Sequence, residues 1–255
     1  MWILALALAL AAGLSMCVPA AARSSGEPIK LVWLEGDVAG MTAIYGPDGG
    51  SPIGFVEYHQ KRRGDLLSSV RIAHFRDGSS DEDSAVARVN GQLEALSGRS
   101  ITRDTAGQAL TDVQVDVAGR RIAATWGRGE EQHTMDEHVD LPAGTYWGPL
   151  IFIVLKNFDA NAEDGRLVFR TVAPSPKPIV LDMELSRGAQ EAVERTGTRL
   201  DTRHFELRPT VHWALDPLVR MVAPTANFWT MPGEPPALVR FAGPRNYARQ
   251  PIVIQ

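Results

Sequence analysis

The sequence is almost without cysteine, since Cys17 is the only one in 255 residues. If the segment before Arg23 is removed on export, the mature chain has no thiol at all. Disulfides are then impossible even in an oxidising compartment, so stability must come from burial of apolar surface. The lone cysteine also excludes a C-x-x-C redox motif.

The chain also lacks an excess of basic charge. Its 26 Lys and Arg residues are set against 30 Asp and Glu residues, which leaves a formal net charge of −4. No basic stripe follows the sequence, as tracking a phosphate backbone would require. Nucleic acid is therefore not expected as a partner.

The common catalytic motifs are missing as well. The stretch "GGSPI" at residues 49–53 departs from a G-x-S-x-G elbow at its last position, and no alternation of strand and helix surrounds it. No glycine-rich phosphate loop follows a predicted strand. We therefore expect no cofactor, and a binding protein is favoured over an enzyme.

Charge is absent from the beginning of the chain. Residues 2–18 are uncharged, and Ala20 to Ala22 form a small-x-small cleavage site. This pattern predicts a signal peptide at residues 1–22 and a periplasmic or secreted mature protein. Lipidation at Cys17 ranks second, because Met16 is bulkier than the small residue usual before a lipidated cysteine. A retained membrane anchor ranks third, since the apolar run approaches the ~20 residues of a spanning helix.

After Pro28 the chain alternates short apolar-periodic stretches with turn residues, which is typical of antiparallel β proteins. One hairpin is predicted from residues 53–60 and 66–75, with its turn at 62–65. A second spans residues 110–126, where Val113 and Ile122 belong to one buried face. We expect a mainly β fold, a single antiparallel half-barrel or sandwich with one or two short helices, in one domain at residues 23–255.

Three segments do not follow a clear strand pattern. Residues 146–158 are apolar for most of their length and fit a buried helix or a buried strand. Residues 216–222 begin with Asp-Pro and predict a short helix. Residues 84–97 carry apolar residues at helical spacing, yet Asn90-Gly91 is a strong hairpin signal, so two strands are favoured.

Four carboxylates crowd the stretch "HFRDGSSDEDSAV" at residues 74–86. An EF-hand loop counted from Asp77 fails, because position 6 is Glu82 and position 12 is Arg88. A solvated turn that ends a strand is favoured. A calcium site built by Asp77, Asp81 and Asp83 is the weaker alternative.

The stretch "EEQHTMDEH" offers a second metal candidate in His133 and His138. Their separation of five differs from the i, i+4 pair of H-E-x-x-H, so the two rings would not share a helix face. A charged, exposed strand or loop is favoured. A metal-dependent hydrolase using these histidines or the acidic stretch is the third functional hypothesis.

Two apolar segments extend beyond the strand pattern, and core filling is their commonest use. The alternative is that they line a cavity for a lipid-like or other hydrophobic ligand. The candidate ligand-binding residues are Trp147, Leu150, Phe152, Leu155, Leu218, Met221 and Trp229.

Several short motifs resemble a family of exported β-rich proteins of Gram-negative bacteria with no assigned activity. They include Glu137 to Pro142, Leu155 to Asn157, and Pro236 to Pro244, within a similarity over about residues 53–255. The architecture is loosely similar to periplasmic lipoprotein carriers, whose curved sheet wraps a helix and holds acyl chains.

The resemblance implies a fold more than a reaction. We expect an exported envelope protein that binds a hydrophobic ligand without catalysis. The alternative is a structural or assembly factor that acts through contacts with envelope proteins.

Overall fold

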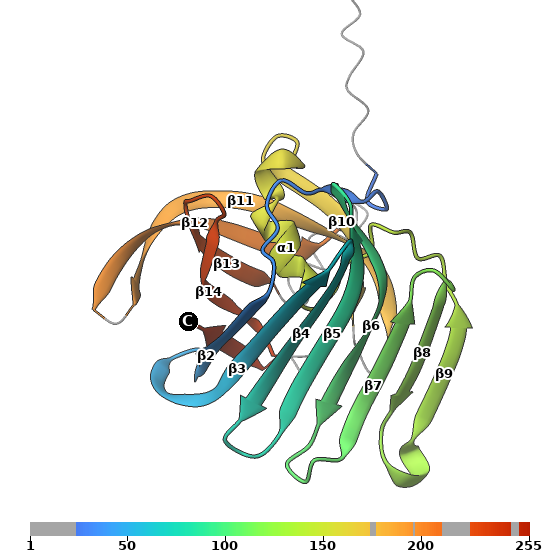
Figure 1. Cartoon of the computed structure of the whole chain (residues 1–255). Helices are drawn as coiled ribbons and strands as arrows, with labels where there is room; N and C mark the ends of the chain where they lie inside the picture. Colours follow the sequence, from blue (N-terminus) through green and yellow to red (C-terminus); the bar gives the residue numbers. More distant parts are fainter. Residues whose placement is uncertain (1–23, 174–176, 196, 211–224, 246–249) are drawn as a thin grey trace, which may run out of the picture.

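The computed structural model describes residues 24–173, 177–195, 197–210, 225–245 and 250–255. Its main feature is one antiparallel sheet that does not close into a barrel (Figure 1). The predicted mainly β fold, a single antiparallel half-barrel or sandwich, is therefore confirmed. The predicted signal peptide, including Cys17, lies outside the described residues.

The described strands are β1 (Ile29–Lys30), β2 (Val38–Gly46), β3 (Gly49–Arg63), β4 (Leu66–Phe75), β5 (Ser80–Val89), β6 (Gln92–Arg103), β7 (Ala109–Asp116), β8 (Arg121–Trp126), β9 (His133–His138), β10 (Arg166–Ala173), β11 (Ile179–Arg195), β12 (Thr198–Pro209), β13 (Ala226–Met231), β14 (Ala237–Pro244) and β15 (Pro251–Ile254). The helical elements are α1 (Leu150–Lys156) and the short 3-10 turns η1 (Gly129–Glu131) and η2 (Phe158–Ala160).

The strand order is β10-β11-β12-β13-β14-β15-β2-β3-β4-β5-β6-β7-β8-β9, with β1 beside β6. The chain thus enters in the middle of the sheet at β2 and runs strand by strand to the edge at β9. It then crosses through α1 to the opposite edge at β10 and returns to β15. Pairing of β15 with β2 joins the two halves, with Ile254 opposite Ile44.

The predicted hairpins are present. Arg63 pairs with Leu66 at the β3–β4 turn, and Val115 pairs with Ile122 between β7 and β8. Residues 84–97 form the strands β5 and β6, as favoured from the sequence, and Gly91 in their turn has a φ of 87°. Burial alternates along β5 with period two, which a helix would not give.

The apolar segment at 146–158 contains α1, so its helix alternative is confirmed. Leu150, Ile153 and Val154 are buried at helical spacing. The sheet curves around this helix (Figure 1). The Phe152 ring lies 6.1 Å from Tyr58 on β3 and 6.4 Å from Phe228 on β13, so α1 contacts both halves of the sheet. The helix predicted at 216–222 lies outside the described residues.

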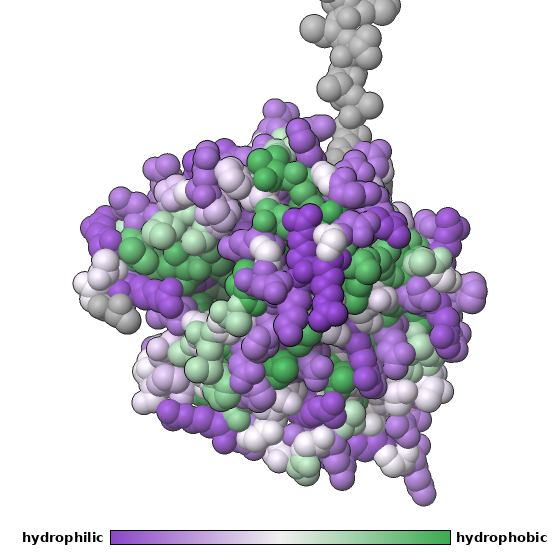
Figure 2. All heavy atoms as spheres, viewed as in Figure 1, coloured by the Kyte–Doolittle hydropathy of each residue, from purple (hydrophilic) through white to green (hydrophobic). Residues whose placement is uncertain are grey.

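The core lies on the inner, concave side of the sheet, around α1. Its largest fully buried side chains include Tyr146, Phe158 and Phe169. Figure 2 shows hydrophilic residues over much of the visible surface, with hydrophobic residues gathered near α1 and in the hollow beside the β11–β12 hairpin. Within the described ranges, no helix is long and apolar enough to cross a membrane.

Candidate functional site

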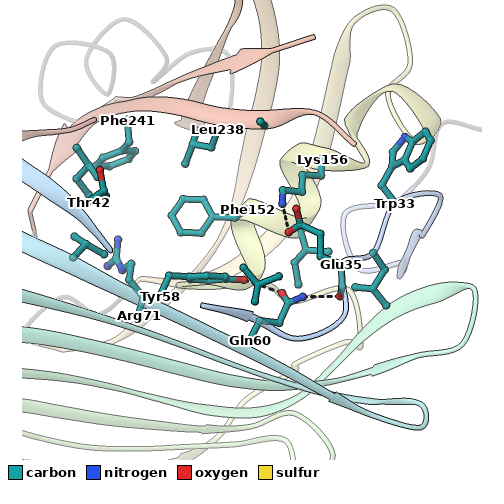
Figure 3. Close-up of a pocket in the computed structure, with 16 residues that line it drawn as sticks. Trp33, Glu35, Thr42, Tyr58, Gln60, Arg71, Phe152, Lys156, Leu238 and Phe241 are labelled. Carbon is teal, nitrogen blue, oxygen red and sulfur yellow. Dashed lines mark hydrogen bonds and ion pairs between the residues drawn. The ribbon is translucent and has the colours of Figure 1, made fainter. Parts of the chain in front are cut away.

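A cavity of about 320 Å³ lies between α1 and the inner face of the sheet. Strands β2, β3 and β4 form one side, and β14 and β15 form another (Figure 3). Its volume falls at the lower end of the ~300–1,000 Å³ range of small-molecule sites. The cavity also lies where the two halves of the sheet meet, so its shape depends on the whole fold.

The period of two along β3 decides which side chains line the cavity. Val56, Tyr58 and Gln60 point inward, whereas Phe55 beside them is 38% exposed on the outer face. The Phe152 ring projects from α1 into the middle of the space (Figure 3). The apolar lining residues are Trp33, Leu34, Val38, Val56, Phe152, Ile153, Ala237, Leu238, Phe241 and Ile254.

One wall of the cavity is a non-strand segment at residues 31–36, which we call the strap. Side-chain amides hold its backbone in place. Asn157, the C-cap residue of α1, accepts hydrogen bonds from the N–H groups of Val32 at 2.7 Å and Trp33 at 2.8 Å. Gln60 Nε2 donates to the Glu35 carbonyl at 2.8 Å. Asn157 and Gln60 are 1% and 2% exposed, so the strap is positioned from inside the core.

Polar side chains lie at the two ends of the cavity, with Phe152 between them (Figure 3). At one end Lys156 on α1 forms an ion pair with Glu35 of the strap. At the other end Arg71 on β4 lies near Thr42 on β2. The space therefore has an apolar middle and two polar ends, a shape suited to an amphiphile.

Arg71 is paired through its Nη2 atom, which bonds the carboxylate of Asp83 on β5. Asp83 also accepts a hydrogen bond from Ser100 Oγ at 2.7 Å. The Nε of Arg71 is buried and has no hydrogen-bond partner among the residues that the structure describes. This N–H donor is therefore enclosed by protein atoms and does not face the cavity.

Tyr58 lies directly opposite Arg71 in the β3–β4 register. Its hydroxyl donates to Gln60 Oε1 at 2.8 Å. Burial raises the pKa of the phenol above its usual value of 10.0. Tyr58 is therefore a neutral hydrogen-bonding group in the cavity at ordinary pH.

The acidic stretch at 77–83 differs from the expectation of a turn with its charges in water. Asp81 and Asp83 lie in β5 on its buried face, at 6% and 7% exposure. Arginines compensate them: Arg245 Nε donates to Asp81 at 2.8 Å, and Arg71 pairs with Asp83. The expectation was wrong for these two residues because strand alternation turns both inward.

Asp77 does lie in the turn that follows β4. Its carboxylate accepts a hydrogen bond from the hydroxyl of Ser79 at 2.5 Å and another from the backbone N–H of Ser79 at 2.9 Å. These bonds lower the pKa of Asp77. Asp77, Asp81 and Asp83 thus have separate partners and do not converge on one point.

His133 and His138 stand at the two ends of β9, an edge strand. Their odd separation places them on opposite faces. The His133 ring lies 5.5 Å from Trp126. In the described part of the chain, no three His, Cys, Asp or Glu side chains lie close enough together to hold a metal ion. The structure therefore does not bring the predicted metal ligands together.

The structure places the predicted ligand-binding residues in different surroundings. Phe152 lines the cavity. Leu155 borders a second, larger hollow of about 580 Å³ that shares Trp33 and Lys156 with the first. Trp147 and Leu150 are buried in the core, 4% and 0% exposed, and line neither of these two hollows.

Trp229 lies beside the inward-facing Phe228 and points the other way. Its ring stacks on His204 at 4.9 Å, and its Nε1 donates to Glu191 at 2.8 Å. It does not line the cavity. Leu218 and Met221 lie outside the described residues.

The sequence analysis did not identify Tyr58, Gln60 or Arg71. A signal was present, because the turn predicted at 62–65 pairs residues whose numbers sum to about 127. That rule places Arg71 on the strand face of Val56 and Tyr58, although the observed register differs by two residues and sets Arg71 opposite Tyr58. Polar residues on an otherwise apolar strand face mark either a site or a buried network.

The comparisons with known proteins add no relative to this geometry. No protein-family model matches the chain, and no curated protein matches it either. The functional argument therefore rests on the cavity and its walls.

Proposed function

We propose that the protein is an exported binding protein that holds a hydrophobic, lipid-like ligand in the cavity beneath α1 and catalyses no reaction. The observation that carries the proposal is the cavity of about 320 Å³ with mainly apolar walls, inside a sheet that stays open. Concave apolar sites with a few placed polar groups are the usual form of small-molecule sites. The predicted signal peptide supports an envelope location.

The polar groups of the cavity support binding more than chemistry. Gln60 binds the strap, and the Tyr58 hydroxyl binds Gln60. Lys156 is paired with Glu35. No Ser, Cys or His side chain lines the cavity among the described residues, so a hydroxyl or thiol nucleophile beside a histidine base is not found there.

The first test of the proposal is to fill the cavity. Thr42 lies on its wall, whereas the neighbouring Met41 on β2 is 72% exposed. Thr42→Phe should weaken binding of a lipophilic naphthylamine dye by about tenfold or more, because the added ring occupies the ligand's space. Met41→Phe is the matched control and should bind the dye like the wild type.

Dye titrations measure the affinity of each variant, and circular dichroism checks that the variant is folded. A second filling variant, Leu238→Phe on β14, serves if Thr42→Phe does not fold. Equal dye binding by the wild type and a folded filling variant would show that the cavity is not the binding site.

The structural or assembly factor remains the alternative. It would need a large apolar patch on the outer surface. The exposed large hydrophobic residues of the described chain are scattered instead over several elements; they are Val32, Met41, Phe55, Leu66, Ile179 and Met231. This scatter and the cavity beneath α1 favour the binding protein over the assembly factor.

A further inference from the structure

A second hollow, of about 580 Å³, lies next to the cavity beneath α1. Trp33 and Lys156 line both spaces, so these two side chains lie on the boundary between them. Figure 3 places both residues at the end of the cavity that also carries Glu35. A ligand that leaves the cavity at this polar end therefore enters the second hollow.

The second hollow has an excess of positive charge at one side. Arg203 on β12 and Asp159 in η2 line it, and Arg203 Nη1 lies 3.0 Å from Asp159 Oδ2. Arg187 on β11 bonds the other oxygen of the same carboxylate. Within the described ranges neither arginine forms an ion pair with a further acid, so two guanidinium charges share one carboxylate. One positive charge is left over beside the hollow.

These charged groups are accessible to a ligand. The side chains of Arg203 and Arg187 are 38% and 42% exposed, and that of Asp159 is 57% exposed. Arginine presents a planar fork of N–H donors that matches the oxygens of a phosphate group. The side of the hollow at Arg203 therefore suits a phosphate more than an uncharged group.

Two other charged residues line the hollow. Lys156 is paired with Glu35, so this pair adds no net charge. Glu234 belongs to the connection between β13 and β14 and is exposed, so water screens its carboxylate. An anionic group is thus attracted to the Arg203 side of the hollow and repelled from Glu234.

Resting on the function proposed above, we propose that the ligand is a single-chain lipid with a phosphate in its headgroup, and that the second hollow holds this phosphate against Arg203. The hydrocarbon chain lies in the cavity along Phe152 (Figure 3). The volume of that cavity, about 320 Å³, suits one chain rather than two. The apolar walls supply most of the affinity, and the arginine selects the headgroup.

Two lipids that differ only in the phosphate test the headgroup. They are lauroylglycerol phosphate and monolauroylglycerol, each displacing the naphthylamine dye below its micellar concentration. The phosphate lipid should bind the wild type about fivefold more tightly, the effect of one partly exposed ion pair. Added salt should narrow this difference, because it screens exposed charges. Inorganic phosphate alone should show no binding by calorimetry at concentrations that saturate the site with the phosphate lipid.

Arg203→Gln removes one cation and leaves Asp159 paired with Arg187, so the carboxylate keeps a partner. This variant should bind the two lipids with about equal affinity. The matched control is Arg199→Gln, because Arg199 lies on the same strand, is exposed and lines neither hollow. The control should keep the preference of the wild type for the phosphate lipid.

The outcomes separate the headgroup from the binding function. Equal affinity of the two lipids for the wild type, an undiminished preference in folded Arg203→Gln, or tight binding of inorganic phosphate alone overturns the lipid phosphate, while dye binding still supports the cavity. Failure of the dye and of both lipids to bind the wild type overturns the binding function, and the headgroup with it. The comparison of the two lipids on the wild type is decisive by itself if Arg203→Gln does not fold.

Discussion

At the scale of single residues, Gly98 on β6 shows how tightly the inner face is packed. A Cβ atom there would lie 2.3 Å from the Ser84 carbonyl oxygen and 2.6 Å from Cζ2 of Trp147. Trp147 is 4% exposed and cannot move aside without disturbing the core. The site therefore requires a residue without a side chain.

Gly98→Ala should lower the free energy of unfolding by ~1–3 kcal/mol, the usual range for overpacking a core. Gly40 on β2 is the matched control, because its Cβ would have no heavy atom within 4 Å. Gly40→Ala should leave stability within ~0.5 kcal/mol of the wild type. Urea unfolding of both variants measures the difference, and an equal effect of the two would contradict the described packing.

Tyr58 gives a prediction about pH. Burial raises the pKa of its phenol in the folded chain, so the unfolded phenol ionises first as the pH rises through 10.0. The stability that depends on neutral Tyr58 is therefore present below that pH and lost above it. Urea unfolding of the wild type and of Tyr58→Phe, each at neutral and at alkaline pH, measures the effect. The free energy of unfolding should fall less between the two pH values in Tyr58→Phe than in the wild type. An equal alkaline loss would rule out a buried phenol.

The sequence predicts which apolar residues are buried better than it predicts which polar residues pair. The period of two places Val113, Val115 and Ile122 on a buried face, and they are buried. The same pattern does not place Asp83, because a carboxylate on a strand looks solvated until its partner is known. That partner, Arg71, comes from the neighbouring strand, and Arg245 reaches Asp81 from 164 positions away.

At the scale of elements, the strap at residues 31–36 depends on side chains from distant parts of the chain. Asn157 alone accepts from two backbone N–H groups of the strap and donates to the Trp33 carbonyl at 2.8 Å. Asn161 makes similar bonds to Lys30, but at an exposed position. The two asparagines thus offer a matched comparison.

Asn157→Ala should lower the free energy of unfolding by ~2–4 kcal/mol, since buried strap groups lose their partners. Asn161→Ala should have a smaller effect, because water can replace its bonds. Hydrogen exchange at Val32 and Trp33 should quicken in Asn157→Ala. Unchanged exchange at both amides would contradict the role of Asn157 in holding the strap.

The apolar run at residues 146–158 is compatible with a buried helix or a buried strand, and its periodicity does not decide between them. The structure shows the helix α1. Its place in the topology explains the outcome: it connects β9 at one edge of the sheet with β10 at the other. A strand in this place would have to pair with an edge, whereas a helix satisfies its own backbone while it crosses the concave face. That information lies in the topology and not in the segment.

At the scale of the whole molecule, the sequence predicts an antiparallel β fold because hairpins are local. It does not predict that β15 returns to pair with β2, since this pairing joins residues about 200 positions apart and has no turn signal. The cavity depends on that return, because Ile254 on β15 and Phe241 on β14 form its second side. The strands could thus be predicted from the sequence, and the cavity between them could not.

The central claim is that the cavity beneath α1 holds a lipid-like ligand. Native mass spectrometry of the protein purified from its native host tests it most directly. The account predicts a bound species with the mass of a lipid, lost in the Thr42→Phe variant and retained in Met41→Phe. Ligand-free protein that also fails to bind the lipophilic dye would contradict the account.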